Sequence, residues 1–499
     1  MLSALIWIPI LGAAVIGFWP GVIAPKITRK ISLVIAGAAF LWSVFLATQF
    51  DPSVGGLQFS EFLPWIKPLG LNYNLGIDGL SLPLVILNCL LTGIAIYSTD
   101  ESIHRPRVYY ALMLLIAGGV AGAFLAQNLL LFFLFFEIEL IPLYLLIAIW
   151  GGARKGYAAT KFLLYTAVAG ILVLASFLGV VWFSGAGSFD LETLQASSLP
   201  LRTQIILLTG ILVAFAIKIP LVPFHTWLPD AHVEASTPVS VLLAGVLLKL
   251  GTYGMLRFGL GLFPEAWAIL SPWLASWAVV SVLYGASCAI AQKDMKKMVA
   301  YSSIAHMGYI LLGSAAATPV SLIGTVLQMV SHGLISGLLF LSVGVVYKKS
   351  GSRDLDIIKG LLNPERGLPM IGTLMILGVM ASAGIPGMAG FIAEFLVFRG
   401  SMPIFPVQTL LCMIGTGLTS VYFLIMVNRA FFGRLSDLVI NLPQVLWRDR
   451  IPPMILAVII IILGLLPSVV VGLSEATATA IVAPVQSVVQ LSQSFDSKL

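Results

Sequence analysis

Runs of about 20 apolar residues recur along nearly the whole chain and are separated by short polar connections. Because the hydrocarbon core of a bilayer requires about 20 apolar residues per helical span, this pattern predicts a helical protein that crosses a membrane many times. The composition agrees, since 59% of the 499 residues are hydrophobic and 10% are charged. Soluble proteins are about 25% charged. The values exclude a soluble enzyme, a disordered chain and an ordinary nucleic-acid-binding protein.

The apolar runs predict an all-α membrane protein with about 14 transmembrane helices. Their centres lie near residues 11, 41, 88, 116, 139, 170, 215, 247, 279, 308, 334, 382, 418 and 462. The first run, residues 2–20, has no basic segment before it and is followed by Lys26, Arg29 and Lys30. Because a cleavable signal peptide has the opposite order, we expect this run to remain as a membrane helix.

Basic residues are concentrated in alternate connections between the predicted helices. Connections after odd-numbered helices contain 20 Lys and Arg residues, whereas those after even-numbered helices contain Lys67, Arg202, Arg257 and Arg399. Since cytoplasmic loops of membrane proteins are enriched in Lys and Arg, this bias places both termini on the non-cytoplasmic side. The end of the chain, from Ser474, is mildly polar, and we expect an interfacial tail there.

Two of the predicted helices contain residues that break a helix. In the seventh, Pro220 and Pro223 each remove an N–H donor and free a carbonyl one turn earlier. In the twelfth, Pro386 and Gly387 lie within an apolar segment that is too long for one span. Backbone that is broken at membrane depth persists only where it is buried in protein or lines a wet cavity.

The two broken helices are five segments apart, which indicates a pair of inverted five-helix repeats. An odd number of helices in each repeat inverts the second copy relative to the membrane. The organisation predicts four regions: helices 1–3 in residues 1–106, the first repeat in 107–262, the second repeat in 263–435, and helix 14 with the interfacial tail in 436–499.

Five charged residues fall inside apolar segments, where a charge costs about 3 kcal/mol on insertion scales. They are Lys218, Lys249, Glu137, Glu139 and Glu394. One interpretation is that they form buried Glu–Lys pairs that lock helices together, although such pairs are weak evidence for stability. The other is a proton or ion pathway, because burial and a movable counter-ion both change how tightly Lys and Glu hold a proton.

The positions of the acids and histidines refine the pathway hypothesis. Glu137 and Glu139 are two residues apart and point to different faces of a helix, so at most one faces the same path as Lys218. His306 and His332 lie in consecutive apolar segments. A lone membrane histidine is more often a hydrogen-bonded helix contact, but two of them fit a relay, because neutral imidazole both accepts and donates a proton.

Haem or copper ligation is the alternative use of the histidines. The chain has five His residues, and no pair has the helical spacing of metal ligands. His225 and His232 end the seventh segment, where we expect them to hydrogen-bond irregular backbone. Cys89, Cys288 and Cys412 are far apart, so we expect neither a disulfide framework nor an iron–sulfur or zinc site. The sequence contains no phosphate-binding loop and no nucleophile elbow.

The charged and broken segments read, in chain order, FFEIELIPLYLLIAIWGG, AFAIKIPLVPFHTWLPDAHVEASTPVSVLLAGVLLKLGTYG, KKMVAYSSIAHMGYILLG and GIPGMAGFIAEF. Together with LGIDGLSLPL, they resemble the antiporter-like chain 4 of respiratory complex I and its photosynthetic relatives, over about residues 70–435. EIELIP with its second acid, followed by GYAATKFLLYTA, is more similar to the cyanobacterial and plastid NAD(P)H–plastoquinone oxidoreductase. ERGLPMIGTLMILGVMASAGIPG departs from the plastid chain and points to the cyanobacterial variants that serve inorganic-carbon uptake.

The resemblance implies a proton-transfer role for six positions. They are Glu137, Lys218, Lys249, His306, His332 and Glu394. In the family the first two form an ion pair, the second lysine passes protons toward the centre, the histidines are central and the last acid is terminal. The resemblance supplies no role for Glu139.

The resemblance also implies a proton-translocating subunit of an NAD(P)H- or ferredoxin-dependent plastoquinone oxidoreductase. We expect no cofactor, metal or redox centre on this chain, and plastoquinone and iron–sulfur clusters would belong to other subunits. The implied partners are other membrane subunits, including further antiporter-like chains, and lipid, with no nucleic acid. The implied location is the cyanobacterial thylakoid membrane, with both termini on the lumenal side.

Two other functions fit the same residues. A subunit of a multi-subunit cation/proton antiporter would have the same fold and buried charges, and only its partners would distinguish it. In a structural role the charges would be inert contacts between helices. Full pumping after replacement of both Glu137 and Lys218 by apolar residues would favour that role.

Overall fold

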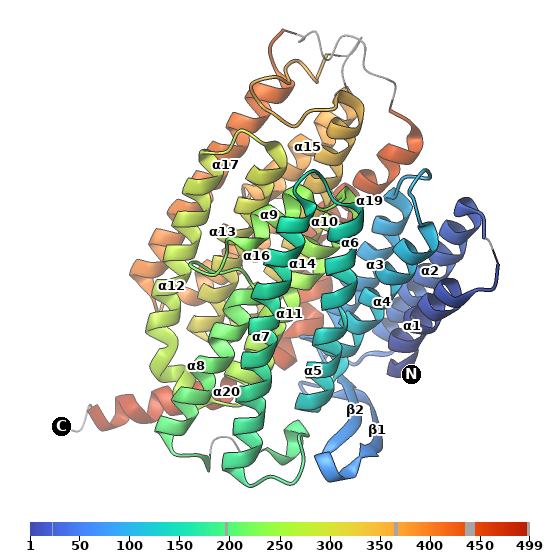
Figure 1. The fold of residues 1–499 in the computed structure, drawn as a ribbon. Coiled ribbons are helices and arrows are strands. Elements are labelled where there is room, and N and C mark those ends of the chain that lie inside the picture. Colours follow the sequence, from blue (N-terminus) through green and yellow to red (C-terminus); the bar gives the residue numbers. More distant parts are fainter. Residues whose placement is uncertain (22, 195–197, 364–367, 435–444, 497–499) are drawn as a thin grey trace.

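The chain folds into a large helical bundle with one β-hairpin at one end (Figure 1). The computed structural model describes residues 1–21, 23–194, 198–363, 368–434 and 445–496. Within these residues, the hairpin is the only departure from an all-α fold. It pairs β1 (Gln58–Ile66) with β2 (Leu71–Ile77) in antiparallel register around a short turn. Sequence analysis did not predict these strands.

The helices before the first interrupted segment are α1 (Leu2–Phe18), α2 (Pro25–Gln49), α3 (Leu82–Ser98) and α4 (Pro106–Leu125). The remaining helices are α5 (Leu129–Ile138), α6 (Leu140–Trp150), α7 (Lys155–Ser184), α8 (Leu201–Lys218), α9 (Trp227–Glu234), α10 (Thr237–Leu242), α11 (Leu248–Gly254), α12 (Pro264–Ile290), α13 (Met295–Ala316), α14 (Pro319–Ser350), α15 (Pro369–Ser382), α16 (Ala389–Ser401), α17 (Pro406–Phe431), α19 (Trp447–Leu465) and α20 (Ser468–Asp496). Many begin with proline, which suits the first helical turn because its missing N–H has no partner there.

Length and composition make ten helical stretches of the described residues candidate membrane spans, of which Leu129–Trp150 combines α5 with α6 and Thr237–Leu260 contains α10 and α11. Three shorter apolar helices, α1, α3 and α15, add to them. The protein is therefore an all-α membrane protein. The end of the chain is helical beyond Ser474, because α20 continues to Asp496. In Figure 1 this helix crosses the end of the bundle that carries the hairpin and takes the C-terminus away from it.

Several of the apolar helical segments are interrupted along their length. The chain leaves α8 after Lys218 and re-enters a helix at Trp227, across Pro220 and Pro223. It leaves α15 after Ser382 and re-enters at Ala389, across a turn in which Gly384 and Gly387 both have positive φ. Positive φ is strained for residues with a Cβ, so glycine suits both positions.

Two further irregularities were not predicted. The helix through the paired acids is divided at Glu139, between α5 and α6. Pro142 accounts for this division, because it cannot donate to the carbonyl of Ile138 and its ring clashes with that carbonyl. The helix through Lys249 contains two π-helical stretches, Leu243–Leu247 and Met255–Leu260. Such stretches leave carbonyls free to bond side chains and occur often at functional sites.

Many of the basic residues that we assigned to connections lie within helices instead, such as Lys348 and Lys349 in the last turn of α14. Among the four that follow even-numbered helices, three do so. Arg202 lies in the first turn of α8, Arg257 lies in the π-helical stretch Met255–Leu260, and Arg399 lies in the last turn of α16. Helix ends defined by hydropathy alone stop too early, because long basic side chains at the end of a span keep their charged heads away from the lipid core.

Candidate functional site

Lys218 is the last residue of α8 and is almost fully buried. Its ammonium forms an ion pair with the carboxylate of Glu139, at the division between α5 and α6. It also lies 4.8 Å from the centre of the Phe136 ring, at a distance that allows a cation–π contact. The expected partner of Lys218 was Glu137, so the structure corrects that pairing and gives Glu139 a defined contact.

Glu137 lies on a different side of the same helical segment. Its carboxyl group rests against Gly170 of α7, so closely that a Cβ atom at position 170 would come 2.1 Å from Oε1 of Glu137. Glu137 is partly exposed and has no ion-pair partner within the described part of the chain. The opposite directions of the two acids follow from their spacing of two residues on a helix.

Lys249 lies on α11, between the two π-helical stretches, and is fully buried. Its ammonium donates to the carbonyl of Ala244 at 2.5 Å, within the first π-helical stretch. The same nitrogen lies 2.7 Å from Nδ1 of His332 on α14. The π-helical turn thus supplies an acceptor for a lysine that would otherwise have too few polar partners in the membrane.

His306 of α13 is the next group beyond His332, with ring centres 5.6 Å apart. Nε2 of His306 lies 2.9 Å from the hydroxyl of Ser382, the last residue of α15. Its Nδ1 faces both the side-chain amide of Gln328 at 3.3 Å and a carboxylate oxygen of Glu394 at 3.5 Å. The imidazole therefore has a polar partner at each ring nitrogen and can accept and donate a proton.

Glu394 lies on α16, just beyond the second broken turn, and is buried. Its Oε2 accepts a hydrogen bond from the hydroxyl of Thr416 at 2.9 Å. That hydroxyl in turn lies 3.3 Å from the hydroxyl of Tyr309. The turn approaches the acid closely, since a Cβ atom at Gly384 would lie 3.2 Å from Oε2.

A small cavity adjoins the two histidines and Glu394. The volume open to the centre of a water molecule is about 10 Å³, and the lining includes Ser302, Gln328, Ser336 and Ser382. A cavity of about 10–15 Å³ on this measure holds one water if two to four polar groups face it. This space is therefore sufficient for one water between His306, His332 and Glu394.

The first lysine is not joined directly to the second. Within the described residues, no hydrogen bond or ion pair connects Lys218 with Lys249. Their helices nevertheless pack closely, because a Cβ atom at Gly251 would lie 3.2 Å from the Cβ of Lys218. The structure thus joins four of the six predicted residues, Lys249, His332, His306 and Glu394, into one series, with Lys218 beside it and Glu137 apart.

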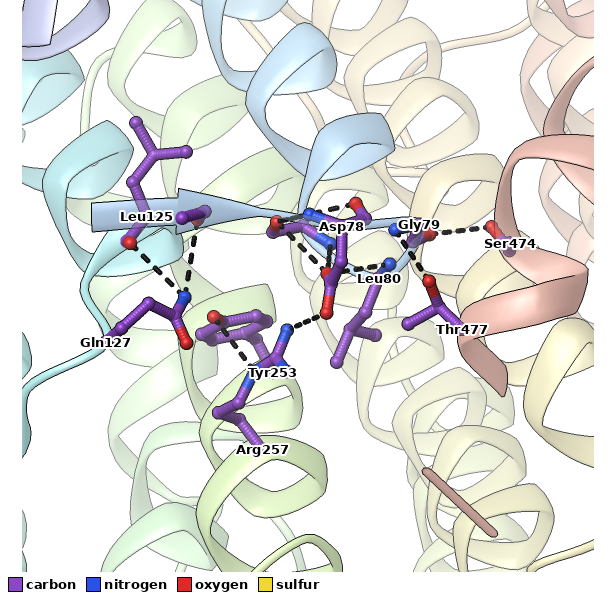
Figure 2. Close-up of polar contacts among 11 residues, drawn as sticks. Asp78, Gly79, Leu80, Leu125, Gln127, Tyr253, Arg257, Ser474 and Thr477 are labelled. Atoms are coloured by element: carbon purple, nitrogen blue, oxygen red, sulfur yellow. Dashed lines mark hydrogen bonds and ion pairs between the residues drawn. The ribbon is translucent and has the colours of Figure 1, made fainter. Parts of the chain in front are cut away.

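Sequence analysis missed a buried ion pair between Asp78 and Arg257, which Figure 2 shows together with its neighbours. The guanidinium lies 2.5 Å from Oδ2 of Asp78 and also donates to the hydroxyl of Tyr253 at 3.2 Å. The other oxygen of Asp78 accepts from backbone N–H groups of Leu80 and Ser81. Asp78 is the acidic residue of the segment LGIDGLSLPL, which begins a predicted span. Sequence analysis treated this segment only as part of the family resemblance.

The same turn anchors the C-terminal helix. The N–H of Gly79 donates to the hydroxyl of Thr477 at 3.0 Å, and the hydroxyl of Ser474 donates to the carbonyl of Gly79 at 2.8 Å (Figure 2). A Cβ atom at Gly79 would lie 2.0 Å from the carbonyl oxygen of Leu473, so only glycine fits there. The ion pair and α20 therefore hold the turn before α3 from two sides.

His232 departs from its expected role. It is fully buried in α9, and within the described residues neither ring nitrogen has a hydrogen-bond partner. Its ring stacks on Phe340 of α14, with centres 4.5 Å apart. The expectation that it hydrogen-bonds irregular backbone is wrong. As to metals, no cluster of three or more His, Cys, Asp or Glu side chains that could hold an ion occurs in the part of the chain that the structure describes.

Comparison with known proteins supplies the family. Residues 126–419 match the family model "NADH:quinone oxidoreductase/Mrp antiporter, TM". The NAD(P)H-quinone oxidoreductase chain 4 1 of Synechococcus sp. (strain JA-3-3Ab) is 40% identical over 97% of this chain and 93% of its own. The chain belongs to the family of NAD(P)H-quinone oxidoreductase chain 4. A relative numbered chain 4 2, from Microcystis aeruginosa, is 42% identical over 87% of this chain and 79% of its own.

Solved structures agree with the family assignment. A chain of respiratory complex I from Thermus thermophilus with bound NADH superposes with a TM-score of 0.87 at 28% identity, covering 97% of this chain and all of that chain. A chain of the Mrp complex from Dietzia sp. has the same fold, with a TM-score of 0.87 at 20% identity, covering 98% of each chain. Both solved structures are multi-subunit complexes.

Proposed function

We propose that this chain is the proton-translocating, antiporter-like membrane subunit of an NAD(P)H- or ferredoxin-dependent plastoquinone oxidoreductase. The observation that carries the proposal is the buried series Lys249, His332, His306 and Glu394, in which neighbouring groups are separated by hydrogen-bonding distances or by space for one water. Ionisable groups of this kind are costly in a membrane, so a series of them supports a functional rather than an incidental role. The family membership supports the same function.

In this mechanism the chain carries no redox step. Plastoquinone and iron–sulfur clusters belong to other subunits, where electron transfer takes place. A change of charge beside this subunit opens the ion pair of Lys218, and the freed ammonium then acts on the proton at Lys249. The proton passes from Lys249 through His332 and His306 to Glu394, with water filling the gaps. Each imidazole accepts at one nitrogen and donates at the other.

The topology belongs to the same proposal. Fourteen spans, with inverted repeats in residues 107–262 and 263–435, would place one broken helix in each repeat. The flanking regions, 1–106 and 436–499, would then pack at the sides of the repeats. The excess of Lys and Arg in alternate connections supports lumenal termini in a cyanobacterial thylakoid membrane. Further antiporter-like chains and other membrane subunits would be the partners.

The test uses membranes in which Lys249→Ala or Glu394→Ala is assembled into the complex. We expect proton pumping to be lost in both, with quinone reduction slowed because the two processes are coupled. Exposed Lys67 offers a matched control, since Lys67→Ala removes a lysine outside the series and is expected to pump normally. Wild-type quinone reduction and a wild-type proton gradient in both relay variants would refute the proposal.

A subunit of a cation/proton antiporter is the second candidate function, because the family model and the fold include Mrp antiporter chains. The composition of the purified native complex distinguishes the two. Co-purification with iron–sulfur subunits and quinone-dependent activity is expected for the oxidoreductase, whereas sodium-dependent proton exchange without them would support the antiporter. Carbon-uptake subunits in the same preparation would assign the chain to that variant.

A further inference from the structure

An apolar groove lies between three helices beside the N-terminal part of the bundle. α2 and α19 both pack on α3 (Figure 1), and the groove that the three helices enclose has a volume of about 260 Å³. All of the described residues that line it are uncharged. On α3 the lining extends from Cys89 to Tyr97, which is about 12 Å along a helix. Because the hydrocarbon of one bilayer leaflet is about 15 Å thick, a groove of this length corresponds to most of one leaflet.

Two glycines leave the groove open. Gly37 of α2 and Gly93 of α3 line it, and a Cβ atom at either position would meet no atom of the described chain within 4 Å. Both residues are half-buried, so the open space lies between helices rather than on a fully exposed face. Helices that pack closely leave few spaces larger than a water molecule. A flexible apolar chain would supply the contacts that the two glycines do not make.

Two arginines lie at one end of the groove. Arg29 precedes the lining residue Leu33 by one turn of α2. Arg448 precedes the lining residue Pro452 by one turn of α19. The guanidinium of Arg29 also lies over the ring of Tyr97, 5.2 Å from its centre. Because basic side chains at the end of a membrane helix hold their charged heads at the level of the lipid headgroups, this end of the groove lies at the membrane surface.

The two arginines share one acid. Nη1 of Arg29 lies 3.2 Å from Oε1 of Glu101, and Nη1 of Arg448 lies 2.8 Å from the same oxygen. Nη2 of Arg29 donates to the carbonyl of Tyr97 at 2.5 Å, and Nη2 of Arg448 donates to that of Thr99 at 2.7 Å. A guanidinium has five N–H donors, so each arginine retains donors that have no partner among the described residues. The cluster therefore has an excess positive charge and unused donors.

The neighbouring lysines and aspartates do not neutralise this excess, because they pair with one another. Lys348 lies 3.1 Å from a carboxylate oxygen of Asp100 and 3.4 Å from one of Asp449. Lys349 lies 3.7 Å from the other oxygen of Asp449. Two lysines thus face two aspartates. A ligand group with one negative charge would complement the two arginines and their shared acid.

We propose that this groove binds one anionic membrane lipid. An acyl chain lies between α2, α3 and α19, and the phosphate or sulfonate of the headgroup lies against Arg29 and Arg448. Guanidinium groups bind such oxyanions with two parallel hydrogen bonds, and basic pockets between membrane helices bind anionic headgroups. The lipid would join α2 to α19 across α3. This proposal is independent of the proton relay, so its failure would leave the proposed function unaffected.

The first test is a cryo-electron microscopy structure of the assembled complex, freed of native lipid and placed in nanodiscs. The nanodiscs contain phosphatidylcholine and a minor share of phosphatidylglycerol with brominated acyl chains. We expect bromine density in the groove and headgroup density at the two arginines. Brominated phosphatidylcholine supplied alone should occupy the groove severalfold less. Equal occupancy by phosphatidylcholine, or a helix of another subunit in the groove, would overturn the proposal.

Arg448→Gln tests the recognition of the headgroup. The change removes one of the two cations and leaves Glu101 paired with Arg29, so we expect the complex to assemble. The occupancy of brominated phosphatidylglycerol should fall severalfold, and Arg448→Lys should restore part of it. Lys30→Gln is the matched control, because it removes an exposed positive charge next to Arg29 in the chain, and it should retain the lipid. Unchanged occupancy in Arg448→Gln would overturn the proposal.

Gly93→Leu tests the acyl-chain part of the groove and leaves the arginines intact. Its side chain would enter the open space, so we expect the bromine density in the groove to be lost. Gly417→Leu on α17 is the matched control, because a Cβ atom at this exposed glycine also meets nothing within 4 Å in the described chain. It should retain the lipid. Full occupancy in Gly93→Leu would overturn the proposal even if Arg448→Gln fails to assemble.

Discussion

The surroundings of the two broken helices differ in how they hold charge. Beside the break after α8, Lys218 and Glu139 neutralise each other directly in a buried ion pair. Beside the break between α15 and α16, Glu394 has no lysine or arginine partner among the described residues and contacts an imidazole and a hydroxyl instead. A small cavity accompanies the second arrangement.

The two arrangements suit different tasks: the ion pair of Lys218 holds a charge in place, whereas the groups around Glu394 suit the transfer of a proton. A buried ion pair keeps its charges in place until one partner moves, so it suits a switch. Imidazole and hydroxyl groups both accept and donate hydrogen bonds, and the cavity beside them has room for one water that would link them, so they suit conduction. We therefore interpret the region of Lys218 as the switch and the region of His306 and Glu394 as the conducting part of the same subunit.

The largest expected effect comes from removing both acids beside Lys218. Glu137→Gln with Glu139→Gln leaves a buried lysine without a counter-ion, which costs about 3–5 kcal/mol. We expect a strongly lowered thermal stability of the purified complex, or little assembled complex in the membrane. Glu394→Gln removes a carboxylate whose partners are His306 and Thr416, and it should cost less, about 1–3 kcal/mol. Equal losses in the two variants would contradict the distinction between the regions.

The next largest effect on stability is expected when glycines beside the two breaks are replaced by alanine. A Cβ atom at Gly390 would lie 2.0 Å from the carbonyl oxygen of Ala381, across the second break. Gly390→Ala should therefore lower the free energy of unfolding by about 1–3 kcal/mol, since backbone must shift. At Gly251 the nearest atom is the side-chain methylene carbon Cγ1 of Ile219 at 2.7 Å, so Gly251→Ala should cost less.

Gly417 supplies the control for both glycine variants. A Cβ atom there meets nothing within 4 Å, and alanine favours a helix over glycine by up to about 1 kcal/mol, so Gly417→Ala should be neutral or stabilising. Thermal unfolding of the three purified complexes checks the order. A loss in Gly417→Ala as large as that in Gly390→Ala would show that close approach at the break is not the cause.

The smallest expected effect tests the conducting region alone. Thr416→Val removes the hydroxyl that donates to Glu394 at 2.9 Å, a contribution of about 1 kcal/mol. We expect a severalfold decrease in the pumping rate with little change in the amount of complex. Thr373→Val, at an exposed threonine of α15, is the matched control and should pump normally. If Thr416→Val also pumps at the normal rate, the hydrogen bond from this hydroxyl does not affect proton transfer at Glu394.

Much of the fold could be predicted from local chemistry. The interruption after Lys218 follows from Pro220 and Pro223, whose missing donors act within one helical turn. The division at Glu139 follows equally from Pro142, although sequence analysis did not use that residue. The β-hairpin was missed because β1 is largely exposed and lacks the alternating apolar pattern that marks a half-buried strand.

The sequence by itself determined that Lys218, Lys249 and Glu394 lie within apolar segments, and that the chain breaks at Pro220 and Pro386. Both follow from short-range rules, because lipid excludes charge and proline removes a backbone donor. Only the tertiary structure decided which groups meet: Lys218 pairs with an acid 79 residues away, and Lys249 meets a histidine 83 residues away. Such contacts depend on how helices pack against one another, so spacing along the chain separated the two acids by face but could not choose Glu139 over Glu137.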